Sequence, residues 1–193
     1  MDALREFRFN SGRLCLDLSA TIRRRASEPQ DILGTPGAVA RWLRNAGLVQ
    51  APWDLSSSRE SALLNLREVI WRLADAAVAG RPPPLDAVAD LNEAASHPLA
   101  VPQLDAQSGG ILFIADDPFR TALATIARDA IELLGGPLKA KIKACAQPDC
   151  RMLFLDASRS GRRRWCSMDR CGSRAKGETF RHRHKGDDHE HRA

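Results

Sequence analysis

Apolar residues recur every three or four positions through most of the first 136 residues, which is the pattern of amphipathic helices. The clearest case is residues 56–80, where one apolar stripe runs to Gly80, a residue type that often ends a helix. The stripe consists of Leu63, Leu66, Ile70, Leu73 and Ala77. The same spacing predicts four more helices, over residues 11–25, 35–48, 82–98 and 118–136. Ser11 is the predicted N-cap of the first, and Asp116 or Asp117 caps the last. In the helix over 82–98, the side chains predicted to face inward are Leu85, Val88 and Leu91.

Residues 99–117 depart from the helical spacing. Two apolar, β-prone stretches flank Ser108-Gly109-Gly110, an arrangement that predicts a β-hairpin. The strongest break in the chain is Gly135-Gly136-Pro137, and we place a domain boundary there. The predicted fold is therefore α+β: a predominantly α-helical body with a β-hairpin over residues 1–136, and a small C-terminal domain over 139–185. The polar residues 186–193 predict a disordered tail.

The composition is that of a protein that folds in water. Of the 193 residues, 44% are hydrophobic, which is enough for a core, and 27% are charged. No apolar run approaches the ~18 residues of a membrane-spanning helix. The first ten residues mix acids with arginines where a signal peptide would be apolar. We therefore expect a cytoplasmic protein, with no membrane partner, whose thiols stay reduced.

Positive charge is concentrated in the C-terminal third of the chain. The net charge is +5 at pH 7, yet residues 1–138 carry 14 Arg against 17 acids, a charge of −3. Residues 139–185 carry 14 Lys and Arg against four acids, a charge of +10. A basic segment on a neutral-to-acidic body is typical of a module that binds a polyanion.

Four of the five cysteines lie in the same basic segment. Cys145 and Cys150 form a Cys-x4-Cys pair, and Cys166 and Cys171 form a second pair after fifteen intervening residues. Two short cysteine loops separated by a longer excursion supply the four thiolates of a tetrahedral zinc site, which leaves no open position for a catalytic water. The sequence thus predicts one structural zinc per chain. The alternatives are ordinary core cysteines, or cysteines that pair when oxidised.

The cysteine segment resembles the bacterial CGNR zinc finger, in which Cys-x4-Cys is followed by Phe-x-Asp-x-Ser, basic residues, Arg-Trp-Cys and then Cys-Gly-Asn-Arg. The matching residues here are Phe154, Asp156, Ser158, Arg164, Trp165, Cys166, Cys171, Gly172 and Arg174. Residues 12–21, GRLCLDLSAT, are similar to the opening of the helical domain that usually precedes this finger, in a family described as putative stress-induced transcription regulators. Ser173 stands where the family has asparagine; a serine there can still hydrogen-bond to backbone, but a base-reading role of the asparagine does not carry over.

Seven basic residues are the predicted nucleic-acid contacts. Arg159, Arg162, Arg163 and Arg164 lie between the cysteine pairs, and Arg170, Arg174 and Lys176 lie on and after the second pair. Arginine matches phosphate geometry, so two basic elements held by one zinc would form a rigid phosphate-binding face. Part of this charge has a structural explanation, because cations balance a four-thiolate zinc and one arginine is expected to pair with Asp156. The same arginines would also suit an acidic protein surface, or would simply be solvated by water.

Four further side chains carry smaller expectations. Trp165 is expected to pack over the zinc loops rather than stack on a base. Trp42 and Trp71 lie on apolar helical faces and are predicted to be core residues. Asp17 follows Arg13 by four residues and is expected to form an ion pair with it, or else to face a ligand cavity.

The sequence contains no recognised catalytic motif, so no enzyme class is indicated. The leading prediction is a DNA-binding transcription regulator, in which the finger contacts DNA and the body forms a homodimer or senses a small-molecule effector. The first alternative is a zinc-stabilised module that binds RNA or an acidic protein. The second is an enzyme with a pocket in the helical body. We also expect the zinc to fold residues 139–185 and to leave the body nearly untouched.

Overall fold

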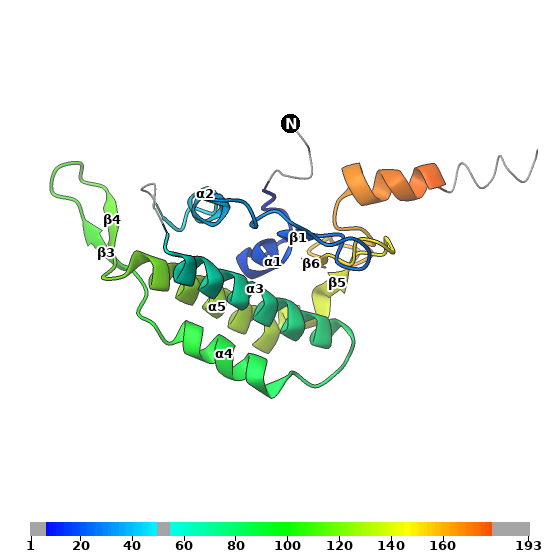
Figure 1. Ribbon diagram of the computed structural model, residues 1–193, viewed down its shortest axis with the longest axis horizontal. Helices are drawn as coiled ribbons and strands as arrows, with labels where there is room; N and C mark the ends of the chain where they lie inside the picture. Colours follow the sequence, from blue (N-terminus) through cyan, green and yellow to red (C-terminus); the bar gives the residue numbers. More distant parts are fainter. Residues whose placement is uncertain (1–6, 50–54, 179–193) are drawn as a thin grey trace, which may run out of the picture.

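Helices dominate this computed structural model, which describes residues 7–49 and 55–178 (Figure 1). The α-helices are α1 (Leu14–Ser19), α2 (Ala38–Asn45), α3 (Ser57–Val78), α4 (Leu85–Ala95) and α5 (Pro118–Gly135). Short antiparallel strands pair as β1 (Ile22–Arg23) with β2 (Gln30–Asp31), β3 (Val101–Leu104) with β4 (Ile111–Ile114), and β5 (Ile142–Ala144) with β6 (Leu153–Leu155). A 3-10 turn η1 (Pro137–Lys141), a π-helical turn η2 (Met168–Gly172) and helical residues 173–178 follow in the C-terminal part. The predicted α-rich α+β fold is confirmed.

The body is built on α3, α4 and α5, which pack against one another, with α1 in contact with α3 and α5 (Figure 1). The two longest of these helices begin at side-chain caps. Ser56 Oγ accepts the backbone N–H of Arg59, and the Asp117 carboxylate accepts those of Phe119 and Arg120. The large side chains fully buried in the resulting core include Trp42, Leu63, Ile70, Ile126 and Leu133. No helix within 7–49 and 55–178 is long and apolar enough to cross a membrane.

Both ends of α1 differ from the helix predicted over residues 11–25. The helix ends at Ser19, because Ile22–Arg23 pair with β2 as strand β1. Ser11 is not its N-cap, because the helix begins after Arg13 and the Ser11 backbone N–H donates to Asp17 Oδ1 at 2.8 Å. The predicted ion pair between Arg13 and Asp17 is also wrong: the Arg13 guanidinium binds Asp129 Oδ1 on α5 at 2.7 Å. Asp129 Oδ2 accepts the Cys15 backbone N–H at 2.9 Å. A carboxylate from α5 thus satisfies the open end of α1.

Two apolar side chains are less buried than their spacing predicts. Leu85 is 83% exposed, because α4 buries a stripe that starts at Ala87, and a residue two positions earlier lies on the opposite side of the helix. Trp71 is half-buried, with the Arg25 guanidinium 4.8 Å from its ring centroid.

The β3–β4 hairpin forms as predicted but stands apart from the helical core (Figure 1). Val101 faces Ile114 in the antiparallel register, and Leu104 faces Ile111. Every residue of both strands is exposed, although most are apolar. This hairpin is therefore an apolar projection rather than a part of the core.

The β5–β6 hairpin packs the C-terminal segment onto the body. Three of its side chains pack into the core formed by the helices: Ile142, Leu153 and Leu155. Alternate residues of a strand point to opposite faces, so Phe154 faces the cysteine cluster instead and β6 is buried on both sides. The Leu155 N–H donates to Ser11 O at 2.7 Å. The adjacent Gly12 has a φ of +91°, and a Cβ there would lie only 3.0 Å from Leu155 Cβ.

The two predicted domains, 1–136 and 139–185, therefore share apolar core. Their division at Gly135-Gly136 stays a prediction. The predicted tail, 186–193, lies outside the residues that the structure describes.

Candidate metal centre and basic surface

Different elements carry the four predicted cysteines to one place. Cys145 follows β5, Cys150 ends the loop before β6, Cys166 follows the arginine-rich loop and Cys171 lies in η2. The chain turns from Cys150 into β6 through Arg151, whose φ is +45°. The four Sγ atoms all lie within 4.8 Å of one another, and all four side chains are buried.

The spacing of the sulfur atoms fits zinc. Four thiolates at Zn–S distances of ~2.3 Å form a tetrahedron whose edges are about 3.8 Å. The Sγ–Sγ separation is 3.8 Å between Cys150 and Cys166, and 3.6 Å between Cys166 and Cys171. The backbone N–H of Cys166 also points at Cys145 Sγ, at 3.5 Å, as is usual around a zinc-bound thiolate. The cluster can hold one zinc ion, and four protein ligands make such a zinc structural.

Aromatic and basic side chains enclose the cluster. Trp165 is half-buried against it, which confirms that this tryptophan packs over the zinc loops, and the Arg164 guanidinium lies 5.1 Å from its ring centroid. The Arg163 guanidinium lies 4.5 Å from the Phe154 ring centroid and donates to the carbonyl oxygens of Trp165 and Cys166. Arg163 therefore holds the arginine-rich loop against the cluster.

Asp156 is the buried anchor of that loop. Its Oδ2 accepts the Lys143 ammonium at 2.7 Å and the Arg163 backbone N–H at 2.9 Å, while its Oδ1 accepts the Ser158 hydroxyl at 2.6 Å. The predicted arginine partner is wrong, because Lys143 projects from β5, the strand paired with β6, and reaches the carboxylate instead. The hydrogen bonds from Lys143 and then Ser158 hold the pKa of Asp156 below its usual range, so this carboxylate stays charged.

The basic residues of the finger divide into open and occupied side chains. Arg159 and Arg162 are exposed, and neither guanidinium makes a hydrogen bond or an ion pair with any residue that the structure describes. The exposed Lys176 ammonium is in the same state. In contrast, Arg174 binds Asp149 through both terminal nitrogens, at 2.8 and 2.9 Å.

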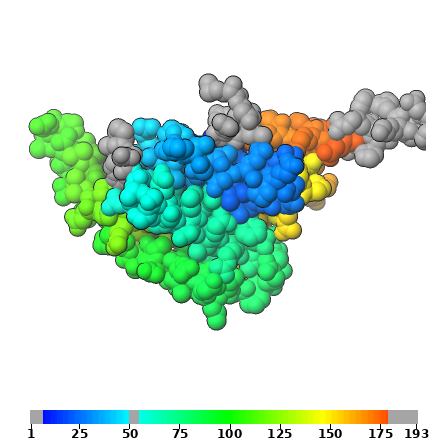
Figure 2. Space-filling view, viewed as in Figure 1, coloured from blue at the N-terminus to red at the C-terminus, as the bar shows by residue number. Residues whose placement is uncertain are grey.

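Arginines from the N-terminal segment lie beside those of the finger. One cavity of about 650 Å³ is lined by Arg8, Arg23 and Arg24 together with Arg170 and Arg174. Figure 2 shows this neighbourhood from outside, with blue N-terminal residues against the yellow and orange residues of the finger. Burial, followed by the charges of Arg170 and Arg8, lowers the pKa of Arg23 to about 10. The part that these N-terminal arginines take in the basic surface was not predicted from the sequence, because residues 1–138 have a net charge of −3. The run Arg23-Arg24-Arg25 is the signal in the sequence that could have pointed to it.

Two family models match the chain. Residues 12–137 match ABATE, described as a putative stress-induced transcription regulator. The chain belongs to the ABATE family. Residues 141–184 match the CGNR zinc finger, as the cysteine pattern led us to expect. In this ABATE protein Ser173, at the position of the finger's usual asparagine, donates through Oγ to Met168 O at 3.0 Å, which is the hydrogen bond to backbone expected of a serine there. A search of curated proteins gave no match.

Proposed function

We propose that this ABATE-family protein is a cytoplasmic, DNA-binding transcription regulator whose zinc-held finger contacts duplex DNA. The observation that carries the proposal is the state of Arg159 and Arg162, which are exposed and unpaired among the described residues while Asp156 and the cysteine cluster fix their loop. A fixed loop presents guanidiniums to phosphates without a large ordering cost on binding. Arg164 and Lys176 are also exposed and add to the positive charge of the finger.

The arginine-lined cavity beside the finger supports contact with a phosphate backbone on a broader face. Arg24 and Arg174 both bind Asp149 there, so a phosphate would compete with an internal acid for these two side chains. We therefore assign most of the affinity to the open side chains of the loop. Arg163 and Arg174, predicted as contacts from the sequence, serve the finger's own structure in this proposal.

The alternatives have less support. A basic surface would also serve RNA or an acidic protein, but the matched family is described as one of transcription regulators, which favours DNA. An enzyme in the helical body is favoured by neither match, since one is to a regulator family and the other to a zinc finger.

The test compares two variants with the same change in charge. The finger variant replaces Arg159, Arg162 and Arg164 with alanine, and the control replaces the exposed body residues Arg41, Arg44 and Arg120. Fluorescence anisotropy with a labelled random-sequence duplex should show roughly tenfold or greater weakening for the finger variant and little change for the control. Wild-type affinity in the finger variant would refute the proposal, and so would binding of RNA but not DNA by the unaltered protein.

We also propose that the β3–β4 hairpin joins two copies of the chain. Its strands are exposed on both faces, and each outer edge lacks a partner strand within the described residues. Pairing the β4 edge with the same edge of a second copy about a twofold axis gives a four-stranded sheet. Ile111 and Phe113, which are 70% and 64% exposed, then gain cross-strand neighbours from the second copy. Light scattering should find a dimer for the wild type and a monomer for Ile111→Lys/Phe113→Lys; a monomeric wild type at micromolar concentration defeats the idea.

A further inference from the structure

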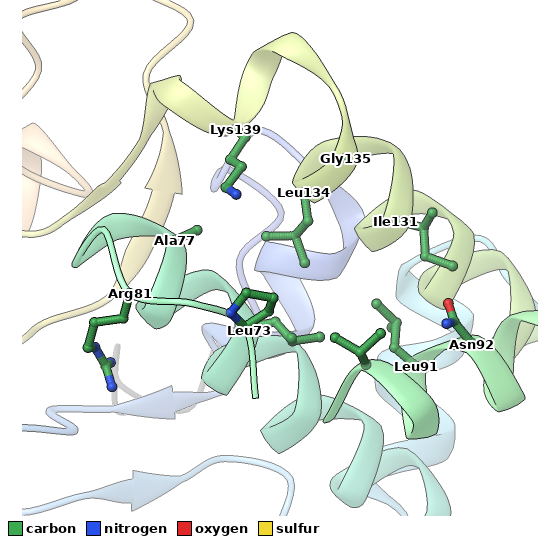
Figure 3. Close-up of a pocket in the computed structure, with 11 residues that line it drawn as sticks. Leu73, Ala77, Arg81, Leu91, Asn92, Ile131, Leu134, Gly135 and Lys139 are labelled. Atoms are coloured by element: carbon green, nitrogen blue, oxygen red, sulfur yellow. The ribbon is translucent and has the colours of Figure 1, made fainter. Parts of the chain in front are cut away.

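A cavity of about 260 Å³, separate from the one beside the finger, opens between α3, α4 and the end of α5 (Figure 3). Its walls are mainly apolar: Leu73, Ala77, Val88, Leu91, Ile131 and Leu134. The volume lies a little below the ~300–1,000 Å³ of pockets that take drug-sized ligands. The cavity therefore suits a smaller, largely apolar molecule.

Among the described residues that line this cavity, the charged side chains are cations. Arg81 and Lys139 lie toward one end, and the Lys139 side chain points to the space between Ala77 and Leu134 (Figure 3). The Lys139 ammonium makes no hydrogen bond or ion pair with any described residue. Arg81 binds Asp75 at 2.6 Å, which leaves Lys139 as the uncompensated charge at the apolar walls.

We propose that this cavity binds a small monocarboxylate with an apolar body, and that Lys139 is the partner of the carboxylate. The apolar body is removed from water by the walls, and the ligand's charge meets an ammonium that has no other partner in the described chain. Because a carboxylate can form a charge-assisted hydrogen bond with Lys139, it should bind more tightly than an alcohol of the same chain length. This inference goes beyond nucleic-acid binding and does not depend on it.

The cavity also borders the segment that leads into the finger. Gly135 and Lys139 line it, and η1 runs from there directly into β5 and on to Cys145. The turn is tight at Gly136, where a Cβ would overlap the Glu132 carbonyl oxygen. A ligand in the cavity would therefore contact the segment that precedes the first zinc ligand.

The proposal is tested by isothermal titration calorimetry of the full-length, zinc-loaded protein. The ligands are three carboxylates, hexanoate, octanoate and phenylacetate, and 1-octanol, which is the uncharged analogue of octanoate. At least one carboxylate should bind saturably with one site per chain, and 1-octanol should bind roughly tenfold more weakly than octanoate. Lys139→Gln should weaken carboxylate binding roughly tenfold. Lys141→Gln, at a lysine that is also exposed but lies outside the cavity, should not weaken binding. Val88→Trp should fill the cavity and abolish binding.

The proposal is overturned if none of the three carboxylates binds saturably at millimolar concentration, if octanoate and 1-octanol bind equally, or if Lys139→Gln keeps full affinity. Full affinity in Val88→Trp overturns it as well, because the ligand then lies elsewhere. Lys139 is exposed, so its variant should fold normally. DNA binding is measured separately, and a failure here leaves the regulatory proposal standing.

Discussion

Replacing Leu155 with alanine removes a side chain that is 5% exposed at the point where the finger meets the helical core. Leucine-to-alanine changes at buried sites cost about 2–5 kcal/mol, depending on how far the surroundings can collapse into the space. Here they can collapse little, because the Leu155 N–H is tied to Ser11 O and Gly12 packs against the same residue. We expect a loss of about 3–4 kcal/mol in the free energy of unfolding.

For a chain of this size, that loss lowers the melting temperature by about 6–16 °C. Far-ultraviolet circular dichroism of the zinc-loaded protein is the assay, since its signal comes mainly from the helices of the body. Leu85→Ala is the matched control: Leu85 is 83% exposed, and its replacement should change stability by less than about 0.5 kcal/mol. If the helices of Leu155→Ala melt at the wild-type temperature, the finger and the body do not share a core and the reasoning is wrong.

Three further predictions follow from the same contacts. Chelating the zinc should unfold the finger and also lower the melting temperature of the helices, because β6 lies between the cysteine cluster and the helical core. The sequence alone led us to expect an untouched body. An unchanged melting temperature of the helices in the chelator would contradict this prediction. Asp129→Ala should lower the free energy of unfolding in urea by about 2–4 kcal/mol, because it removes the partner of both the Arg13 guanidinium and the Cys15 N–H. Glu132→Ala removes only an exposed partner of Arg13 and should lower it by less than about 1 kcal/mol. Equal losses in the two variants would count against the capping role of Asp129. Burial raises the pKa of Asp17 to about 6, so the proton on Asp17 stabilises the fold below about pH 4 and this stabilisation is lost as the pH rises through 6. Asp17→Asn keeps an oxygen that can accept the Ser11 N–H but removes the charge. The variant should be about 1–3 kcal/mol more stable than the wild type at pH 7.5 and nearly as stable as the wild type at pH 4. A stability difference that does not change with pH would argue against the raised pKa of Asp17.

Local signals in the sequence predicted the longest helix, the β3–β4 hairpin and the clustering of four cysteines. The apolar spacing of residues 56–80 predicted α3, and Ser108-Gly109-Gly110 marked the β3–β4 turn. The paired Cys-x4-Cys loops identified four sulfur atoms that the fold brings within 4.8 Å. Each of these signals acts over a few residues, or through a spacing that one metal ion imposes.

Contacts between distant segments could not be predicted in this way. Arg13 binds Asp129, 116 positions along the chain, although Asp17 stands at helical spacing from it. Leu85 satisfies the apolar pattern of α4 yet lies off the stripe that meets α3 and α5. The approach of Arg23 to the finger depends on the tertiary fold, so a charge count by segment assigned it to an acidic body. Periodicity shows which positions repeat, but not which neighbour covers them.

The DNA-binding claim is tested most directly by the salt dependence of duplex binding. Fluorescence anisotropy would follow the zinc-loaded, full-length protein and a labelled random-sequence duplex from low to high ionic strength. Four open contacts, Arg159, Arg162, Arg164 and Lys176, predict that the logarithm of the binding constant falls with the logarithm of salt concentration at a slope of about −3.6, or roughly −0.9 per phosphate. We expect this slope to flatten by about 2–3 when the three arginines are replaced with alanine. Micromolar, zinc-loaded protein that shows no salt-sensitive binding to duplex DNA at low ionic strength would contradict it.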